Sequence, residues 1–511
     1  MTQFTVNANI VTMTIYTPSL KNRPGPKYRA IADAIQDDIH NRVLAVGEQL
    51  PTHRELAFQL AVTVGTVTRA YGELQRCGVI GGRVGRGTYV LSQNVAPDFH
   101  PPNHPDKNQP IFTITPLLNP DHLPDLPTGQ NPQQGHDNSA TTIDLSMNRP
   151  PPGPEAEALA ETLGALSKSG NLSTLTQYNP APGIRHHREA MASLLNTFGL
   201  EATADDLILT SGAQHAMAAS AMAVLKSGDV MLTENYTYPG MTSLAAHLGV
   251  RLHPVAMDEY GLRTDALEAA ILETGARVVY VMPVHQNPTT AVMNQDRLDA
   301  IAKIVKRNDM LVIEDDVYGF QPQDRLVPLA QLAPEHTIYI NGFAKSISPG
   351  LRVGFIKSPK ALFASLTRAV QITGWMTPPL MGEIAARWIT SGVAQQIIAW
   401  HRAEMIARNR MAADILQNFT FAAKPESLHM WMDLPDGHGA DNTIHKLAGR
   451  GVFLAGPESF ITTQPSVPRT LRLCLGAPPT RERLRTALVQ VRDVLSAQPG
   501  QAPLVNGSMV M

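Results

Sequence analysis

A proline-rich stretch early in the chain constrains the fold more than any other feature of the sequence. Between residues 91 and 142 there are ten prolines, set among Asn, Gln, His and Asp residues. Proline fixes the backbone angle φ, and a polar segment has too little apolar surface to offset the entropy lost on folding. We therefore predict a linker over residues 91–142 of a multidomain protein. It separates a small unit, residues 25–90, from a long body, residues 143–496, and residues 1–24 and 497–511 are expected to be disordered ends.

The bulk properties of the 511 residues narrow the class of protein. Hydrophobic residues make up 43% and charged residues 17%, which is typical of a globular protein with a large core. The net charge of −2 means that any contact with nucleic acid needs a local basic patch. The two cysteines, Cys77 and Cys474, indicate a reducing compartment rather than a disulfide scaffold. We find no signal-peptide pattern and no apolar run of roughly 18 residues, so we expect a cytoplasmic protein without a membrane partner.

The small N-terminal unit has the pattern of three helices followed by a hairpin. Apolar residues at spacings of three and four predict a first helix that ends by Gly47; they are Tyr28, Ile31, Ile35, Ile39 and Val43. Thr52 and Glu55 predict a capping box at the start of a second helix, and Thr63 is placed to cap a third. In the third helix the residues expected to face inward are Val67, Ala70, Tyr71 and Leu74, and those expected to face outward are Gly65, Thr66, Thr68 and Arg69.

Two short helices with an exposed polar face suit insertion into the major groove of DNA. The hairpin over residues 81–90 carries Arg83 and Arg86, which could reach a groove or a phosphate. Periodicity alone is equally consistent with a small helical bundle that has a solvated face.

Three stretches of this unit resemble the GntR-type winged helix-turn-helix: QLPTHRELA (Gln49–Ala57), TVTRAY (Thr66–Tyr71) and GRGTYV (Gly85–Val90). The resemblance implies that the unit binds double-stranded DNA, with contacts from Arg54, Thr66, Arg69 and Arg86. One departure is that Thr63-Val64 stand where the family usually has Ser-Arg, so a customary arginine contact is missing.

The body shows several apolar strands that each lead into a polar loop, which predicts an α/β fold with a mostly parallel sheet. The strand Leu207–Thr210 leads to Ser211, Gly212, Ala213 and Gln214 at the start of a helix, where free amides favour an anion. Other strands lead to the loops that contain Tyr238, Asn287 and, in Glu314–Tyr318, Asp315 and Tyr318. An acid at the end of a buried strand needs a cationic partner, although an Asp-Asp pair is also typical of a metal ligand or a helix cap.

Lys345 follows a further apolar run and precedes a Pro-Gly turn and Arg352. A lysine whose pKa is lowered by burial or by a cation can condense with an aldehyde cofactor, and a guanidinium can clamp a phosphate. Considered singly, such a lysine is also typical of a solvated loop.

Taken together, these loops resemble the pyridoxal 5'-phosphate (PLP)-dependent aminotransferases of fold type I over residues 143–496, which have a large, mostly parallel-sheet domain and a smaller α+β domain. The resemblance implies that Lys345 is the catalytic residue and forms the internal aldimine, that Asp315 pairs with the pyridine nitrogen, and that Tyr238 stacks on the ring. It further implies that the ring hydroxyl is bound by Asn287 and Tyr318, and the phosphate by Ser211, Gly212, Ala213, Gln214 and Arg352. Tyr178, in QYNPAPG, matches a tyrosine that reaches the phosphate of the partner subunit in a homodimer. Arg472, in LRLC, matches the arginine that grips an α-carboxylate.

Two positions depart from the usual aminotransferase motifs. Ala344 stands where a serine often contacts the phosphate, and Thr290 replaces the customary glycine after Asn287-Pro288-Thr289. No principal group is lost, and no metal is expected.

The order of winged helix, linker and aminotransferase-like body resembles the MocR group of GntR-family regulators. The function that this implies is a transcriptional regulator whose body senses PLP or an amino-acid effector. The alternative is a working aminotransferase that carries a DNA-binding head, since a sensor needs the same lysine, aspartate and arginine. A cofactor-free scaffold is the third possibility.

Overall fold

The structure is a computed structural model, and it describes residues 16–20, 26–41, 43–45, 47–76, 79–83, 87–90, 142–170, 172–462 and 468–497. These residues form two compact units, which lie within Met1–Thr113 and Ile114–Met511 and are described separately below. Except for Thr142, the expected linker lies outside the described residues, as do Arg86 and most of the two ends expected to be disordered.

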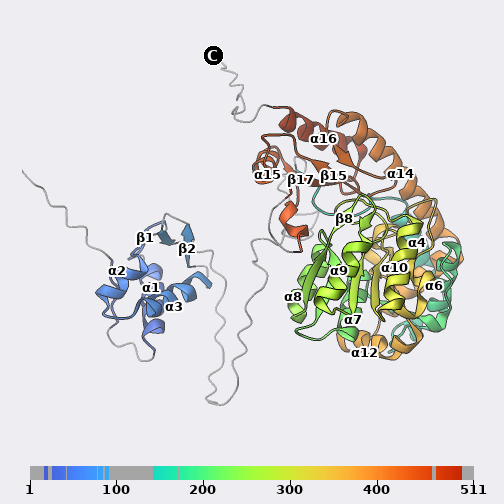
Figure 1. Ribbon diagram of the computed structural model, residues 1–511, viewed down its shortest axis with the longest axis horizontal. Coiled ribbons are helices and arrows are strands. Elements are labelled where there is room, and N and C mark those ends of the chain that lie inside the picture. Colours follow the sequence, from blue (N-terminus) through green and yellow to red (C-terminus); the bar gives the residue numbers. More distant parts are fainter. Residues whose placement is uncertain are drawn as a thin grey trace, which may run out of the picture. The chain divides into compact units, whose positions relative to one another are not determined.

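The N-terminal unit combines three helices with a small antiparallel sheet (Figure 1). The helices are α1 (Lys27–His40), α2 (His53–Gln59) and α3 (Val64–Arg76). The strands, in the spatial order β1-β3-β2, are β1 (Gln49–Leu50), β3 (Gly87–Val90) and β2 (Ile80–Arg83). This arrangement confirms the predicted winged helix-turn-helix.

Short-range hydrogen bonds explain where α2 and α3 begin. Thr52 Oγ1 accepts from the Glu55 N–H at 3.3 Å and Glu55 Oε2 accepts from the Thr52 N–H at 2.9 Å, which confirms the capping box. Thr63 Oγ1 accepts from the Thr66 N–H at 3.2 Å and caps α3. The four residues of α3 expected to face inward are all buried: Val67, Ala70, Tyr71 and Leu74.

Two details of this unit differ from expectation. The first helix ends at His40 rather than near Gly47, and Val43 is 64% exposed. A residue stays on a helical stripe only while the helix continues, so the spacing carries no information about Val43. Within residues 1–24, expected to be disordered, the Tyr16 hydroxyl donates to Asp38 Oδ2 at 2.6 Å and Leu20 packs on the core of the unit.

The body is built on a seven-stranded sheet with the strand order β5-β13-β12-β11-β10-β6-β7. The strands are β5 (Leu207–Thr210), β6 (Val230–Glu234), β7 (Arg251–Val255), β10 (Val278–Val281), β11 (Leu311–Asp315), β12 (Thr337–Gly342) and β13 (Gly354–Lys357). Strand β13 is antiparallel to both of its neighbours and the other pairs are parallel, which confirms the predicted mostly parallel sheet.

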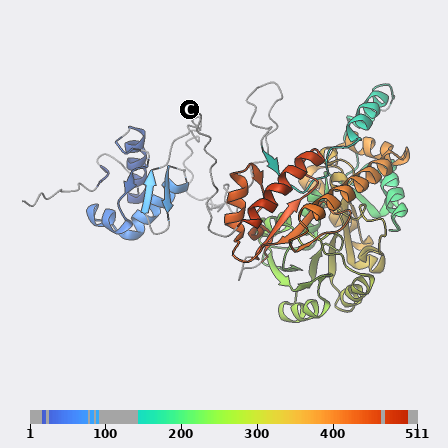
Figure 2. The same ribbon diagram turned by 90° about the horizontal axis from the view of Figure 1, so that it is seen from above.

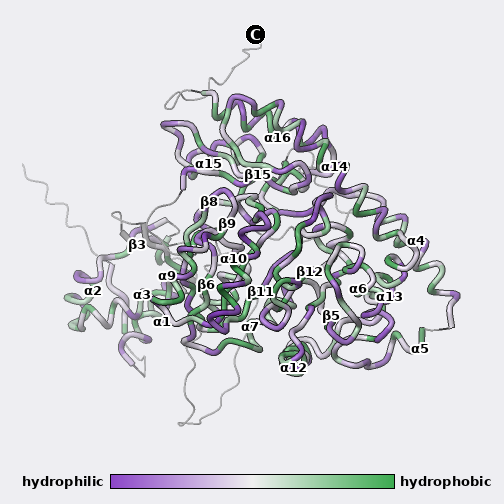
Figure 3. The backbone as a smooth tube through the Cα atoms, turned by 45° about the vertical axis from the view of Figure 1, so that its right-hand side comes forward, coloured by the Kyte–Doolittle hydropathy of each residue, from purple (hydrophilic) through white to green (hydrophobic). Residues whose placement is uncertain are grey.

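Helices cover both faces of this sheet. Because alternate residues of a strand face opposite sides, Tyr280 packs with α7, α8 and α12, whereas Val279 and Val281 pack with α9 and α10. Figure 3 shows hydrophilic and hydrophobic residues alternating along the covering helices, as amphipathic helices require. The helices of this larger part of the body, on both sides of the sheet, are α4 (Glu155–Leu166), α5 (Leu172–Leu175), α6 (Arg185–Thr197), α7 (Ala213–Val224), α8 (Pro239–Leu248), α9 (Thr264–Thr274), α10 (Gln295–Arg307), α11 (Leu329–Leu332), α12 (Phe363–Gly374) and α13 (Pro379–Thr390).

A smaller α+β region completes the body, as expected. Its antiparallel sheet has the order β14-β15-β17, and its helices α14 and α16 pack against each other (orange and red in Figure 2). A second, parallel pair joins β4, the first described strand after the expected linker, to β16. The bounds are β4 (Ile143–Asp144), β14 (Phe421–Ala422), β15 (His429–Asp433), β16 (Val452–Phe453), β17 (Thr470–Cys474), α14 (Val393–Ile415), α15 (Ala440–Ala448) and α16 (Arg481–Ser496); a small hairpin elsewhere in the body is formed by β8 (Met257–Asp258) and β9 (Gly261–Leu262).

Of the helices that the structure describes, none combines the length and the apolar character needed to cross a membrane.

Candidate cofactor site

A cavity of about 130 Å³ opens where the loops after β5, β10, β11 and β12 meet. The carboxyl ends of parallel strands lie at one edge of a sheet, which is where α/β proteins bind their ligands. Eight of the side chains proposed from the sequence line this cavity: Ala213, Gln214, Tyr238, Asn287, Asp315, Tyr318, Lys345 and Arg352. Residues named in the sequence analysis from strand ends and from the aminotransferase resemblance therefore meet around one cavity.

Lys345 lies just after β12, and its Nζ donates to the main-chain oxygen of Asn148 at 2.5 Å. Loss of hydration, and after it the positive charge of Arg472, lower the pKa of the Lys345 amine to about 8. A larger share of the amine is then neutral near pH 7, which is the reactive form for attack on a carbonyl.

Asp315 ends β11 and is fully buried. The Tyr280 hydroxyl donates to its Oδ2 at 2.6 Å and the Val317 N–H donates to its Oδ1 at 3.3 Å. Burial raises the pKa of Asp315 to about 6, and the hydrogen bond from Tyr280 partly offsets that rise. Among the described residues Asp315 makes no ion pair, and the charge of Lys345 acts with these hydrogen bonds to lower its pKa, so a buried acid in this setting can accept a cationic partner.

The start of α7 and Arg352 form the part of the site suited to an anion. Gly212 precedes the helix with φ 88°, and a Cβ at this position would lie 2.5 Å from Arg352 Nη2. Arg352 Nη2 also donates to the Ser211 main-chain oxygen at 3.4 Å. The positive φ favours glycine at this position. The nearby guanidinium of Arg352 brings a positive charge to the amides of a helix N-terminus.

Arg472 on β17 is buried and reaches the cavity through Asn287. Its Nη1 donates to Asn287 Oδ1 at 2.8 Å, its Nη2 donates to the Ser146 main-chain oxygen, and its guanidinium lies 4.6 Å from the centre of the Phe460 ring. These partners are all neutral, and Nε has no partner among the described residues. A buried guanidinium whose hydrogen-bond partners are all neutral is a suitable partner for a carboxylate.

Three site residues were missed from the sequence: Asn148, Tyr280 and His429. Asn148 Nδ2 donates to the Tyr318 hydroxyl at 2.8 Å and to His429 Nδ1 at 2.9 Å. A tyrosine within an otherwise aliphatic buried strand was the available signal for Tyr280, because a buried hydroxyl needs a partner. Nothing local marked Asn148 or His429, which belong to distant segments of the chain.

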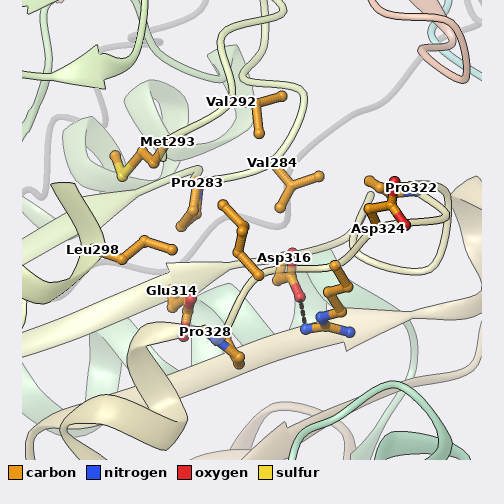
Figure 4. Close-up of a pocket in the computed structure, with 12 residues that line it drawn as sticks. Pro283, Val284, Val292, Met293, Leu298, Glu314, Asp316, Pro322, Asp324 and Pro328 are labelled. Carbon is orange, nitrogen blue, oxygen red and sulfur yellow. Dashed lines mark hydrogen bonds and ion pairs between the residues drawn. The ribbon is translucent and has the colours of Figure 1, made fainter. Parts of the chain in front are cut away.

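The acidic run at the end of β11 divides between the two sides of the strand. Glu314 and Asp316 face a second, smaller cavity of about 40 Å³, shown in Figure 4 with the ion pair between Asp316 and Arg325 dashed. Glu314 accepts from the Leu329 and Ala330 amides at 3.0 and 2.8 Å, and burial raises its pKa to about 8. Only Asp315 is directed to the cavity of Lys345, because the side-chain direction alternates along a strand.

Among the described residues, one group with metal-ligand chemistry lies away from the cavity. The Glu383 carboxylate accepts from His186 Nε2 at 2.7 Å and His187 Nε2 at 3.0 Å, while Arg387 Nε donates to its other oxygen at 2.8 Å. Because Arg387 already balances the charge of Glu383, these contacts are accounted for as an ion-pair network that joins α6 to α13.

Tyr178 does not line the cavity of its own chain. Its side chain is 83% exposed, and its ring centre lies 5.8 Å from that of Trp375, which is 54% exposed.

In the N-terminal unit, Arg54 on α2 and Arg69 on α3 are exposed and Thr66 is half-buried on the first turn of α3. The Arg69 guanidinium lies 3.9 Å from the centre of the Tyr28 ring, which limits its freedom.

Comparisons with known proteins agree with this architecture. Residues 140–491 match the family of class I and II aminotransferases. The chain belongs to this family. Residues 27–90 match the gntR family of bacterial regulatory proteins, so the aminotransferase fold is joined to a regulator head.

Proteins with both parts are found among the relatives. The chain is 27% identical to the uncharacterised HTH-type transcriptional regulator YdeF of Bacillus subtilis, over 94% of this chain and 96% of YdeF. It is 25% identical to PtsJ of Salmonella typhimurium, a transcriptional repressor of vitamin B6 salvage, over 86% and 93% of the two chains. The fold of the body matches LysN of Thermus thermophilus, an α-aminoadipate aminotransferase solved with N-(5'-phosphopyridoxyl)-L-leucine, with a TM-score of 0.63 and 24% identity over 70% of this chain and 92% of LysN.

The Arg472 charge should contribute to the reactivity of Lys345, in addition to burial. In the wild type we expect labelling of Lys345 by a small aldehyde, followed by mass spectrometry, to reach half its maximal rate near pH 8. Arg472→Gln removes the charge and keeps a donor for Asn287, so the midpoint should move to higher pH. The surface variant Arg492→Gln is the control and should leave it unchanged. An unaltered midpoint in Arg472→Gln would show that burial alone lowers the pKa of Lys345.

Proposed function

We propose that the protein is a DNA-binding transcriptional regulator whose aminotransferase-like body binds PLP and responds to PLP or to an amino acid. The observation that carries this proposal is that one chain joins a helix-turn-helix head to a body with a complete set of amine, acid and anion-binding groups. The similarity to YdeF and PtsJ along nearly their whole length supports the same function. The proposed DNA target also implies the cytoplasmic location expected from the sequence.

The cavity fits PLP in its charges. In this proposal Lys345 holds the cofactor, the anion-binding residues around Gly212 and Arg352 take the phosphate, and Tyr238 packs on the ring. Asp315 makes no ion pair among the described residues, and a protonated pyridine nitrogen would be a cationic partner for it. Asn287 Oδ1 is occupied by Arg472, which leaves its Nδ2 to donate to the ring hydroxyl together with the hydroxyl of Tyr318. PLP, when bound, acts as an electron sink for amino-acid chemistry.

The effector site in this proposal centres on Arg472. Its buried guanidinium has only neutral partners, so an α-carboxylate would gain a charge-assisted, two-pronged contact there. An amino acid would thus bind beside the cofactor, and a free PLP effector would need only the phosphate and ring contacts.

The proposed DNA surface consists of Arg54, Thr66, Arg69 and, outside the described residues, Arg86. Thr66 lies on the first turn of α3, where a small side chain allows close approach to base edges. The exposed Arg54 and Arg69 supply positive charge from two helices of the motif.

We also propose a homodimer in which Tyr178 contacts the phosphate site of the partner. Tyr178 is widely exposed, as such a contact requires. Ile372 on α12 and Trp375 directly after α12 are exposed as well. Aminotransferase folds are commonly dimeric, in agreement with this arrangement.

Transamination is the second candidate function. It is favoured by one observation: the chain has both the Lys345 amine and the Asp315 carboxylate, and the pKa of each is shifted toward neutrality. A group that transfers protons near neutral pH needs such a pKa. Turnover of an amino donor with a keto acid would measure it.

Lys345 should be required for the visible spectrum of the PLP complex. We expect wild-type protein to take up PLP and to show a visible absorption band, because the amine is poised for reaction with an aldehyde. Lys345→Ala should lose that band, and Lys306→Ala, at an exposed lysine of α10, should keep it. Wild-type protein that takes up no PLP at saturating cofactor would refute the assignment.

Dimer formation should accompany PLP binding. Light scattering at micromolar concentration is expected to give twice the chain mass of 55.4 kDa, and Tyr178→Ala should weaken PLP binding because it removes a contact to the partner's phosphate. Thr176→Ala, at an exposed hydroxyl nearby, is the control. A monomer that still binds PLP tightly would contradict the proposed interface.

DNA binding should depend on Arg54 and Arg69. On a specific site, replacing an arginine that reads a base should cost about 1–3 kcal/mol, whereas replacing one that contacts phosphate should weaken all sequences alike. Affinity should also fall steeply with salt, because bound phosphates release counterions. The comparison uses promoter DNA from the protein's own locus and random DNA, each with and without PLP and amino acids. Equal affinity for both DNAs under all conditions, together with rapid transamination, would favour the enzyme.

A further inference from the structure

A buried histidine on α14 contacts two main-chain oxygens close to the Lys345 amine. The side chain of His401 is almost fully buried, and the residue is 1% exposed. Its Nδ1 lies 3.0 Å from the Ser346 oxygen, and its Nε2 lies 3.1 Å from the Pro151 oxygen. Both distances are those of a hydrogen bond, and a carbonyl oxygen can only accept. The His401 ring therefore faces two acceptors at once.

These two acceptors determine the charge of the His401 ring. A neutral imidazole has one N–H and one lone pair, so its lone pair would face one of the two oxygens, whereas an imidazolium donates to both. A buried cation needs an opposite charge nearby. Glu155 Oε2 lies 3.8 Å from His401 Nε2 and has no hydrogen-bond partner among the described residues. The Gly153 N–H donates to Glu155 Oε1 at 3.1 Å and so holds this carboxylate in place.

The two oxygens belong to the two segments between which the Lys345 amine lies. Ser346 follows Lys345 directly in the chain. Pro151 comes three residues after Asn148, whose main-chain oxygen accepts from Lys345 Nζ at 2.5 Å. The connection from Asn148 to Pro151 contains two consecutive prolines, which fix φ and make it stiff. The bridge through His401 therefore sets the separation between the Lys345 backbone and the oxygen that its amine contacts.

The next residue of α14 supports the same turn. Arg402 Nε donates to the Gln321 main-chain oxygen at 2.6 Å, and Gln321 Nε2 donates to the Lys345 main-chain oxygen at 2.8 Å. The main-chain oxygens of Lys345 and Ser346 are thus both bonded to side chains that α14 provides or positions. Lys345 lies in a short 3-10 turn after β12, beyond the hydrogen bonds of the sheet, so contacts of this kind have to fix its backbone.

We propose that His401 is a positioning residue for Lys345, which as an imidazolium connects the turn after β12 to the segment after Asn148 and keeps water away from the amine. This inference rests on the proposed function for the use of that amine, although the contacts themselves need no cofactor. Loss of hydration is the first cause of the low pKa of Lys345. Without the bridge the two segments can separate and water can reach the amine. The pKa of Lys345 then rises toward its ordinary value, and less of the amine is neutral near neutral pH.

The test follows the labelling of Lys345 by formaldehyde and cyanoborohydride across a pH series, with mass spectrometry as the readout. It uses full-length protein from which any bound PLP has first been removed with hydroxylamine. His401→Phe keeps a ring and removes both donors. His401→Gln keeps one donor nitrogen and serves if the phenylalanine variant fails to fold, as judged by thermal unfolding.

His336→Phe is the matched control. His336 Nδ1 also bonds to a main-chain oxygen, that of Met310 at 3.0 Å, but His336 precedes β12 and so lies at the opposite end of that strand from Lys345. A loss of thermal stability by itself is therefore expected in both phenylalanine variants, and only a change in Lys345 labelling distinguishes them.

In the wild type and in His336→Phe, the labelling rate should reach half its maximum near pH 8. In the His401 variants this midpoint should shift to higher pH, and further in His401→Phe, because that variant loses both contacts. Selective labelling of histidine with nitrogen-15 should show by NMR, near neutral pH, a ring with hydrogen on both nitrogens whose signals are lost in His401→Gln. Uptake of PLP, followed by its visible band, should be slower in the His401 variants than in the control.

The negative results are distinguishable. An unchanged labelling midpoint in the folded His401 variants would overturn the positioning role, even if the wild type takes up PLP and the proposed function stands. A wild-type His401 ring with one nitrogen free of hydrogen near neutral pH would also overturn it, because the bridge needs both donors. If the wild type takes up no PLP while the midpoint still shifts in the His401 variants, the proposed function fails and the role of His401 in positioning the amine stands.

Discussion

Parallel pairing of β11 with β12 is the constraint on which the site depends. The register sets Asp315 beside Ile340, two residues before the end of β12, and Lys345 follows three residues after that strand. The acid and the amine therefore lie at one edge of the sheet, with Asp315 in the ladder of hydrogen bonds and Lys345 in the short 3-10 turn that follows β12. Strand β13 returns antiparallel beside β12 and begins two residues after Arg352, which brings the guanidinium to the same edge. The cavity is thus an outcome of strand order rather than of any single loop.

The charged groups around the cavity are held by neutral partners. Asp315 has a phenol and an amide, Lys345 has a main-chain oxygen, and Arg472 has an amide oxygen, a main-chain oxygen and an aromatic face. On the opposite side of β11, Asp316 is paired with Arg325 in a closed contact. An ion pair satisfies both of its members and leaves little for a ligand, whereas charges with neutral partners keep most of their electrostatic energy available. This contrast separates the face of the strand that stabilises the fold from the face that can bind.

Sequence reasoning succeeded where one residue's role follows from its position on one element. Asp315 was expected because an acid at the end of an apolar strand is costly to bury without a partner, and Lys345 because it follows an apolar run and precedes a Pro-Gly turn and an arginine. Thr52 was expected from its spacing to Glu55. It failed where the contact joins distant segments. Asn148 lies 170 residues from Tyr318 and 281 from His429, and no local pattern connects them. Val43 was placed on the first helix because periodicity does not show where a helix stops.

The sequence by itself determined the division into two units, the identity of each unit and the list of groups that meet at the strand ends. The division follows from composition, whereas the identities and the list of groups come from short motifs that resemble known families. Only the tertiary structure decided that Lys345 and Arg472 donate to the segment after the expected linker, that the Tyr280 hydroxyl meets Asp315, and that Asn148 bonds to Tyr318. The physical reason is that hydrogen bonds between side chains depend on distances set by the packing of several elements at once. Such distances cannot be read from local patterns of neighbouring residues.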